Sequence, residues 1–104
     1  MNHILTADIG GTNSRFGHFT VDENDRLDLG ESVWLKTTDA GSFSHLLDRL
    51  GRSGFSLLPE AADMTVIAVA GPVEGGVRSR PPLIAWDVDI VDLRKTARPG
   101  KYLL

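Results

Sequence analysis

The chain has 104 residues, of which 41% are hydrophobic, enough apolar side chain for one modest core. A formal net charge of −3 gives no basic surface for nucleic acid, and the absence of cysteine excludes disulfides and thiolate metal sites. Because the start resembles no secretory signal and no apolar run approaches the length of a membrane span, we expect a soluble, cytoplasmic protein with no nucleic-acid or membrane partner.

Three strands are expected in the first part of the chain. The first two are apolar runs separated by two adjacent glycines, and a polar turn at residues 22–26 precedes the third. Short connections of this kind join antiparallel strands, so we expect a meander. The predicted strands cover residues 4–9, 14–21 and 32–37.

Residues 8–15 form the first candidate site. The two glycines in this run let backbone amides approach a ligand closely, because no Cβ intervenes. Asp8 offers a carboxylate for a hydrated metal ion, and Thr12, Asn13 and Arg15 offer a hydroxyl, an amide and a cation to oxyanions. The run is typical of a phosphate-binding hairpin. An ordinary hairpin with a Gly-Gly turn accounts for the glycines but not for these polar groups, and both interpretations stay open on these residues alone.

Several common motifs are absent. The glycines fit neither a G-x-G-x-x-G fingerprint nor a P-loop, no helix follows them, and no G-x-S-x-G elbow occurs. The three histidines share no ligand spacing, so each is expected to be structural or on the surface; they are His3, His18 and His45. The two tryptophans, Trp34 and Trp86, are expected in the core or in a pocket wall.

A helix is expected after the meander. Ser42 is a suitable N-cap, and Gly51 or Gly54 would end the helix. Its apolar side chains recur with helical spacing; they are Phe43, Leu46, Leu47 and Leu50.

A nearly unbroken apolar run at residues 64–70 predicts a strand that is covered on both faces and paired in parallel within an α/β sheet. Gly71 and Pro72 follow at its carboxyl end, where open α/β sheets bind ligands. A chain reversal that needs Gly and Pro explains this turn equally well.

The last part of the chain carries weaker signals. Gly75-Gly76 predicts a small hairpin, and Asp89 is expected to cap a helix that Pro99-Gly100 ends. Residues 101–104 are then expected to begin another strand, which is cut short at Leu104.

Taken together, the chain resembles the amino-terminal part of the first lobe of bacterial glucokinases, in the superfamily of sugar kinases, heat-shock proteins and actin. Residues 6–16 are similar to that family's first phosphate-binding motif, and residues 66–73 followed by Trp86 are similar to a second signature. The resemblance implies an α/β, ribonuclease H-like (actin-like ATPase) first lobe with a mixed sheet in the order β-β-β-α-β-α. Residues 1–104 would form a single incomplete domain, truncated before its last strand.

The function that the resemblance implies is ATP-dependent phosphorylation of glucose to glucose 6-phosphate, with ATP and Mg²⁺ as cofactors. Asp8 would position Mg²⁺ and Arg15 would brace the loop, while Gly71 and Pro72 would lie on the substrate side. The residues lining the ATP phosphates would be Gly10, Gly11, Thr12 and Asn13. Because members of the family often form dimers, a homodimer is a further expectation, although the sequence leaves the oligomeric state open.

Two departures from the family pattern stand out. Family members often carry Thr-Asn shortly before the tryptophan, where this chain has Ser79-Arg80-Pro81-Pro82. The family's catalytic base is an aspartate expected just after Leu104, so no residue of this chain is assigned a catalytic role and the chain alone is expected to be inactive. The alternative function is a non-catalytic module of the same fold that senses sugar or nucleotide or docks to a partner.

Overall fold

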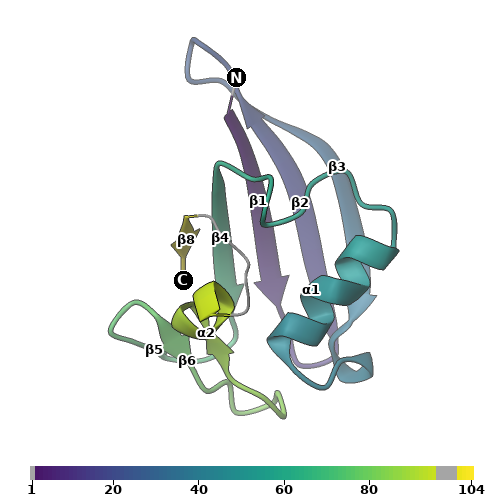
Figure 1. The fold of residues 1–104 in the computed structure, drawn as a ribbon, viewed down its shortest axis with the longest axis vertical. Helices are drawn as coiled ribbons and strands as arrows, with labels where there is room; N and C mark the ends of the chain where they lie inside the picture. The colour runs from purple at the N-terminus through teal and green to yellow at the C-terminus, as the bar shows by residue number, and fades with distance from the viewer. Residues whose placement is uncertain (1, 96–100) are drawn as a thin grey trace.

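The computed structural model describes residues 2–95 and 101–104. Its main sheet has five strands in the order β3-β2-β1-β4-β8 (Figure 1). β1 pairs antiparallel with β2 and parallel with β4, and β4 pairs parallel with β8, so the expected mixed sheet is confirmed. The strands are β1 (Asn2–Ile9), β2 (Asn13–Val21), β3 (Leu27–Lys36), β4 (Met64–Val69) and β8 (Tyr102–Leu103).

The expected meander is confirmed, but β3 begins five residues earlier than predicted, at Leu27. The predicted polar turn before it is present, closed by Asp22, whose Oδ1 accepts from the backbone N–H groups of Asn24 and Arg26. A register shift between His18 and Phe19 lets β2 stay paired with the polar start of β3. The sequence did not indicate this extension because the start of β3 is exposed and lacks a continuous apolar pattern.

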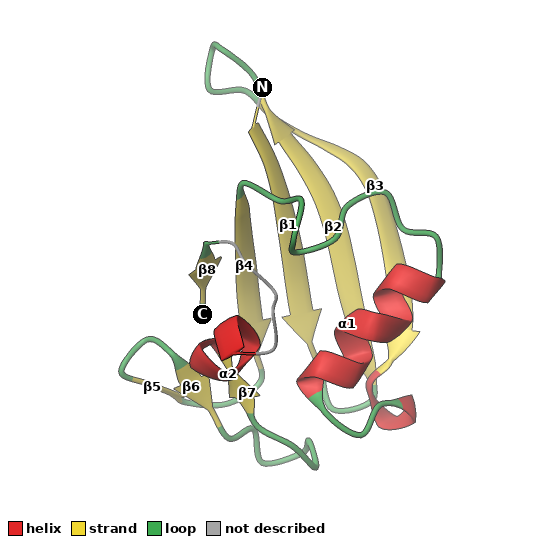
Figure 2. Cartoon of the chain, viewed as in Figure 1, coloured by secondary structure: helices red, strands yellow, loops and turns green. Residues whose placement is uncertain are grey.

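Helix α1 (Phe43–Arg52) packs on one face of the sheet (Figure 2). Ser42 caps it as predicted, since its Oγ accepts a hydrogen bond of 3.0 Å from the backbone N–H of His45. Gly51 lies inside the helix and does not end it; Gly54, at a φ of +79°, follows its C-cap Ser53. The four predicted apolar side chains are all buried in the core, with Leu5, Ile9 and Phe16 of the sheet among their neighbours in one cluster.

The expectation that β4 is covered on both faces is wrong for the described residues. Thr65 and Ile67 are buried, whereas Met64 and Ala68, which alternate with them, are exposed. A short apolar run does not distinguish a strand covered on both faces from one covered on a single face. In the described part of the chain the face opposite α1 is therefore open, and it also exposes Leu29 of β3.

A second, three-stranded sheet follows β4, in the order β5-β6-β7. It comprises β5 (Val73–Glu74), β6 (Arg78–Ser79) and β7 (Val88–Asp89). The predicted Gly75-Gly76 hairpin joins β5 to β6, and both glycines have positive φ values, which few other residues tolerate. Helix α2 (Ile90–Lys95) comes directly after β7, where Asp89 Oδ1 accepts from the N–H of Val91 as expected of a cap.

The predicted helix end at Pro99-Gly100 lies outside the described residues. The strand expected after it is present as β8, next to β4. Neither α1 nor α2, nor any other helix within residues 2–95 and 101–104, is long and apolar enough to cross a membrane.

Candidate functional site

The two predicted turns open at the same edge of the main sheet. β1 and β4 run parallel with Ile9 opposite Val69, and the N–H of Ala70 donates to the carbonyl of Ile9 at 3.3 Å. The arrowheads of both strands point the same way (Figure 1). The turn after β1 and the Gly71-Pro72 turn after β4 therefore lie beside each other.

Crowding explains the two glycines of the β1–β2 turn. Neither Gly10 nor Gly11 has a positive φ, so an unusual backbone conformation is not the reason for them. The N–H of Gly10 donates to the carbonyl of Asn13 at 3.1 Å, and a Cβ at residue 10 would lie 2.7 Å from that oxygen. A Cβ at Gly11 would lie 3.1 Å from Cβ of Leu83. The turn is tight because both positions lack a side chain.

A buried pair of hydroxyls fixes the turn from behind. Ser14 Oγ and Thr37 Oγ1 lie 2.6 Å apart, and both side chains are buried. The backbone N–H of Thr37 also donates to the carbonyl of Thr12 at 2.8 Å. Thr37 begins a short 3-10 helix, η1 (Thr37–Asp39), directly after β3. The sequence predicts Thr37 only as the last residue of a strand. The contact with Ser14 depends on the pairing of β2 with β3, which the sequence does not specify.

The polar side chains of residues 8–15 lie in two places: on the open face of the sheet and at the β1–β2 turn. Asp8 and Arg15 are cross-strand partners on β1 and β2, and Trp34 of β3 is opposite Arg15. Trp34 was expected in the core or in a pocket wall, and a place in the core is wrong: it is 62% exposed, with the Arg15 guanidinium carbon 5.7 Å from its ring centroid. This cation–π contact places the Arg15 guanidinium beside the Trp34 ring on the open face. The side chains of Thr12 and Asn13 are exposed at the turn.

A shallow cavity of about 380 Å³ lies on this open face. Side chains alternate between the two faces of a strand, and those that line this cavity share the open face. Two of them, Asp8 and Arg15, belong to the predicted site. The cavity is lined by Thr6, Asp8, Arg15, Gly17, Phe19 and Leu29.

The space beside Gly71 is filled by another part of the chain. A Cβ at Gly71 would lie 2.8 Å from Cα of Pro81, and the carbonyl of Pro72 accepts from Ser79 Oγ at 2.7 Å. Gly71 is half-buried by this packing, whereas Pro72 remains exposed. Of the two predicted substrate-side residues, Pro72 is the more accessible to a ligand.

Trp86 occupies the pocket-wall position predicted for it. Its Nε1 donates to the carbonyl of Ala40 at 3.0 Å, and its ring stacks on Phe43 with centroids 6.1 Å apart. A cavity of about 180 Å³ lies between Trp86, the Gly11 turn and Thr37.

Two of the three histidines come together although their spacing gave no sign of it. His3 Nδ1 and His18 Nε2 are 2.8 Å apart, and His18 Nδ1 is 2.8 Å from Ser56 Oγ. This chain of hydrogen bonds attaches the segment between α1 and β4 to the sheet, so the predicted structural role fits both residues. Among the side chains that the structure describes, no group of three or more histidine or acidic residues is arranged to hold a metal ion.

Comparison with known families identifies the group to which these features belong. A family model described as Glucokinase matches residues 5–101. The chain belongs to the glucokinase family. It is 40% identical over 74 residues to a glucokinase of Zymomonas mobilis, an alignment that covers 71% of this chain and 22% of that protein.

Two solved glucokinases share the fold. One, from an Antarctic psychrotroph, matches 100% of this chain and 32% of its own with a TM-score of 0.76 and 22% identity. The other, from Leishmania braziliensis, matches 100% of this chain and 29% of its own with a TM-score of 0.69 and 21% identity. The chain thus spans about a fifth of the length of its curated relative and about a third of these two structures.

The hydroxyl pair behind the turn gives a first prediction. Replacing Thr37 by Val leaves the buried Ser14 hydroxyl without its partner, which should lower the free energy of unfolding by about 1–3 kcal/mol. Ser14→Ala should cost a similar amount, and the double variant less than the sum, because no hydroxyl is then left unpaired. Urea unfolding of the four proteins measures the coupling. Additive losses would show that the two hydroxyls do not support each other.

Proposed function

We propose that this chain supplies the first phosphate-binding hairpin of an ATP-dependent glucokinase, which phosphorylates glucose to glucose 6-phosphate in the cytoplasm. Family membership supports the reaction class. The observation that carries the role of the hairpin is its convergence of groups: a crowded glycine turn, the exposed side chains of Thr12 and Asn13, and a carboxylate at the end of β1. We further propose that residues 1–104 are the amino-terminal part of an actin-like, ribonuclease H-like first lobe.

Each residue of the hairpin has a role that its chemistry allows. The missing side chains of Gly10 and Gly11 allow the tight turn on which the phosphates are proposed to rest, while Thr12 and Asn13 offer hydroxyl and amide donors. Arg15 is held on Trp34 at the edge of the cavity, where it braces the hairpin and adds positive potential toward an anion. These separate roles fit phosphoryl transfer, in which positioning and charge neutralisation provide most of the catalysis.

Asp8 is a suitable partner for Mg²⁺. It is exposed beside the turn, and the described residues offer no cluster of three acidic or histidine ligands that would hold a cation by themselves. A single carboxylate, completed by water and by phosphate oxygens of the nucleotide, is a common way in which proteins hold Mg²⁺. When bound there, Mg²⁺ would neutralise charge on the phosphates.

The group that activates the sugar hydroxyl is proposed to lie outside these 104 residues. In the family that this chain resembles, the base is an aspartate expected just after the position of Leu104. Pro72 and the turn that contains it are proposed to face the sugar, and the base and the other sugar ligands to come from the rest of the protein.

Substitution of Asp8 tests the proposed function directly. In the complete product of the gene, Asp8→Asn keeps the size of the side chain but removes its charge, and should lower kcat for ATP-dependent glucose phosphorylation about 100-fold. Asp28→Asn is the matched control, because Asp28 is an exposed aspartate on β3 that only approaches Arg26, at 3.7 Å. A complete product that phosphorylates no glucose, or an Asp8→Asn variant with wild-type kcat, would contradict the proposal.

The glycine turn allows a second test. Gly10→Ala adds a Cβ 2.7 Å from the carbonyl oxygen of Asn13, so the turn must open, and KM for ATP should rise about tenfold. Gly30→Ala is the control, since a Cβ there meets its nearest atom at an ordinary 3.5 Å. Steady-state kinetics with ATP varied at saturating glucose measures both. Equal values of KM for the two variants would show that the turn does not contact ATP.

The isolated 104-residue chain provides a third test. Because we assign the base to another part of the protein, this chain alone should release no glucose 6-phosphate above the uncatalysed background in a coupled assay. Glucose phosphorylation by the chain at the rate of the complete product would overturn this division of the site.

A further inference from the structure

The loop between β6 and β7, residues 80–87, packs against both turns of the candidate site. Cβ of Leu83 lies 3.1 Å from the position a Cβ would take on Gly11, and Cα of Pro81 lies 2.8 Å from the corresponding position on Gly71. Since both glycines lack a side chain, the loop touches the backbone of each turn. Its position therefore limits how far the two turns can move apart.

Trp86 anchors the loop near its carboxyl end. The hydrogen bond of Trp86 to the carbonyl of Ala40 and its stacking on Phe43 tie that end to the segment preceding α1 and to α1 itself. The amino end has no comparable aromatic anchor. There, Ser79 is buried and donates to the carbonyl of Pro72, which holds β6 against the second turn.

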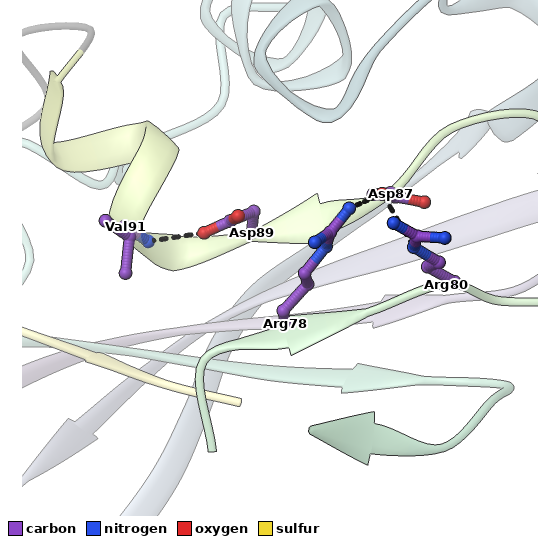
Figure 3. Close-up of polar contacts among 5 residues, drawn as sticks. All are labelled: Arg78, Arg80, Asp87, Asp89 and Val91. Atoms are coloured by element: carbon purple, nitrogen blue, oxygen red, sulfur yellow. Dashed lines mark hydrogen bonds and ion pairs between the residues drawn. The ribbon is translucent and has the colours of Figure 1, made fainter. Parts of the chain in front are cut away.

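The antiparallel pairing of β6 with β7 brings the two ends of the loop together, and a shared carboxylate adds side-chain contacts between them. Arg78 Nη2 donates to Asp87 Oδ2 at 2.7 Å, and Arg80 Nε lies 3.5 Å from the same oxygen (Figure 3). Arg78 belongs to β6, Arg80 begins the loop and Asp87 ends it, so these contacts span the whole loop. The hydrogen bond to Asp87 raises the pKa of Arg78, which is charged in any case at neutral pH.

We propose that Asp87 is a positioning residue: by holding Arg78 and Arg80 it fixes loop 80–87 against Gly11 and Gly71 and so sets the shape of the phosphate-binding turn. The segment concerned is the one in which this sequence has Ser79-Arg80-Pro81-Pro82 in place of the Thr-Asn of the family pattern. Two prolines stiffen the part of the loop that contacts Gly71. A restraint on the ends of the loop therefore also restrains its contact with Gly71.

The exposure of these side chains makes a local effect the expected one. The side chains of Asp87 and Arg80 are 39% and 65% exposed, and ion pairs at such sites add little to global stability. Loss of the carboxylate should therefore loosen the loop and the turn beneath it without unfolding the sheet. The effect on the turn does not depend on which ligand binds there, whereas a change in KM for ATP rests on the proposed function.

Amide hydrogen exchange of the complete gene product tests the proposal. In Asp87→Asn the N–H groups of Gly10 and Thr37, whose hydrogen bonds close the turn, should exchange about tenfold faster. The N–H groups of Leu5 and Ala7 in the middle of β1 should stay within about twofold of the wild-type rate.

Asp28→Asn is the control variant. It removes a carboxylate that approaches Arg26, away from the loop, and should change none of these rates. KM for ATP should rise about fivefold in Asp87→Asn alone.

The outcomes separate this proposal from the proposed function. Unchanged exchange at Gly10 and Thr37 overturns it, as does equal acceleration at Leu5 and Ala7, which marks a global loss of stability. Faster exchange confined to the turn supports it even if the unsubstituted protein fails to bind ATP, in which case the proposed function fails alone. If Asp87→Asn does not fold, Arg78→Gln carries the same test, because it removes the 2.7 Å contact that joins β6 to Asp87 at the other end of the loop.

Discussion

Parallel pairing of β1 with β4 is the constraint on which the candidate site depends. It sets Ile9 opposite Val69, so that the glycine turn after β1 and the Gly71-Pro72 turn after β4 leave the sheet at one edge. Parallel strands cannot be joined by a hairpin, and here the chain reaches β4 from β3 through α1, which covers the sheet on the way. The helix whose leucines fill the core is thus also the connection that aligns the two turns.

Each turn at this edge is held by close contacts from more than one side. The hydroxyl pair of Ser14 and Thr37 supports the first turn from the end of β3, and loop 80–87 packs on Gly11 from the other sheet. Backbone groups that bind phosphate must be fixed before the ligand arrives, because ordering them during binding would cost free energy. In this site the rigidity comes from crowding at glycines, not from a helix terminus.

Much of this arrangement was predictable from the sequence, and the reasons for the failures are physical. The strands, α1 and the motif residues followed from periodicity and residue chemistry, and parallel pairing of β4 followed from its apolar run. The sequence predicts Trp34 in the core or in a pocket wall and misses its exposure, because exposure depends on which face of β3 the ring occupies. That register is set by the bulge between His18 and Phe19. The contacts of Thr37 and of the His3–His18 pair join residues distant in sequence, which local patterns do not encode.

The open geometry of the sheet edge beside the two turns also bears on the difference between binding phosphate and transferring it to a sugar. Asp8 is exposed, and within the described residues the sheet face around it is uncovered. An open site of this kind can bind an anion through amides and a bound cation, but water reaches it freely. Transfer to a sugar in preference to water requires that the reacting groups be enclosed. On the proposed function, the enclosing surface comes from outside these residues, because loop 80–87 is already packed against the glycine turns.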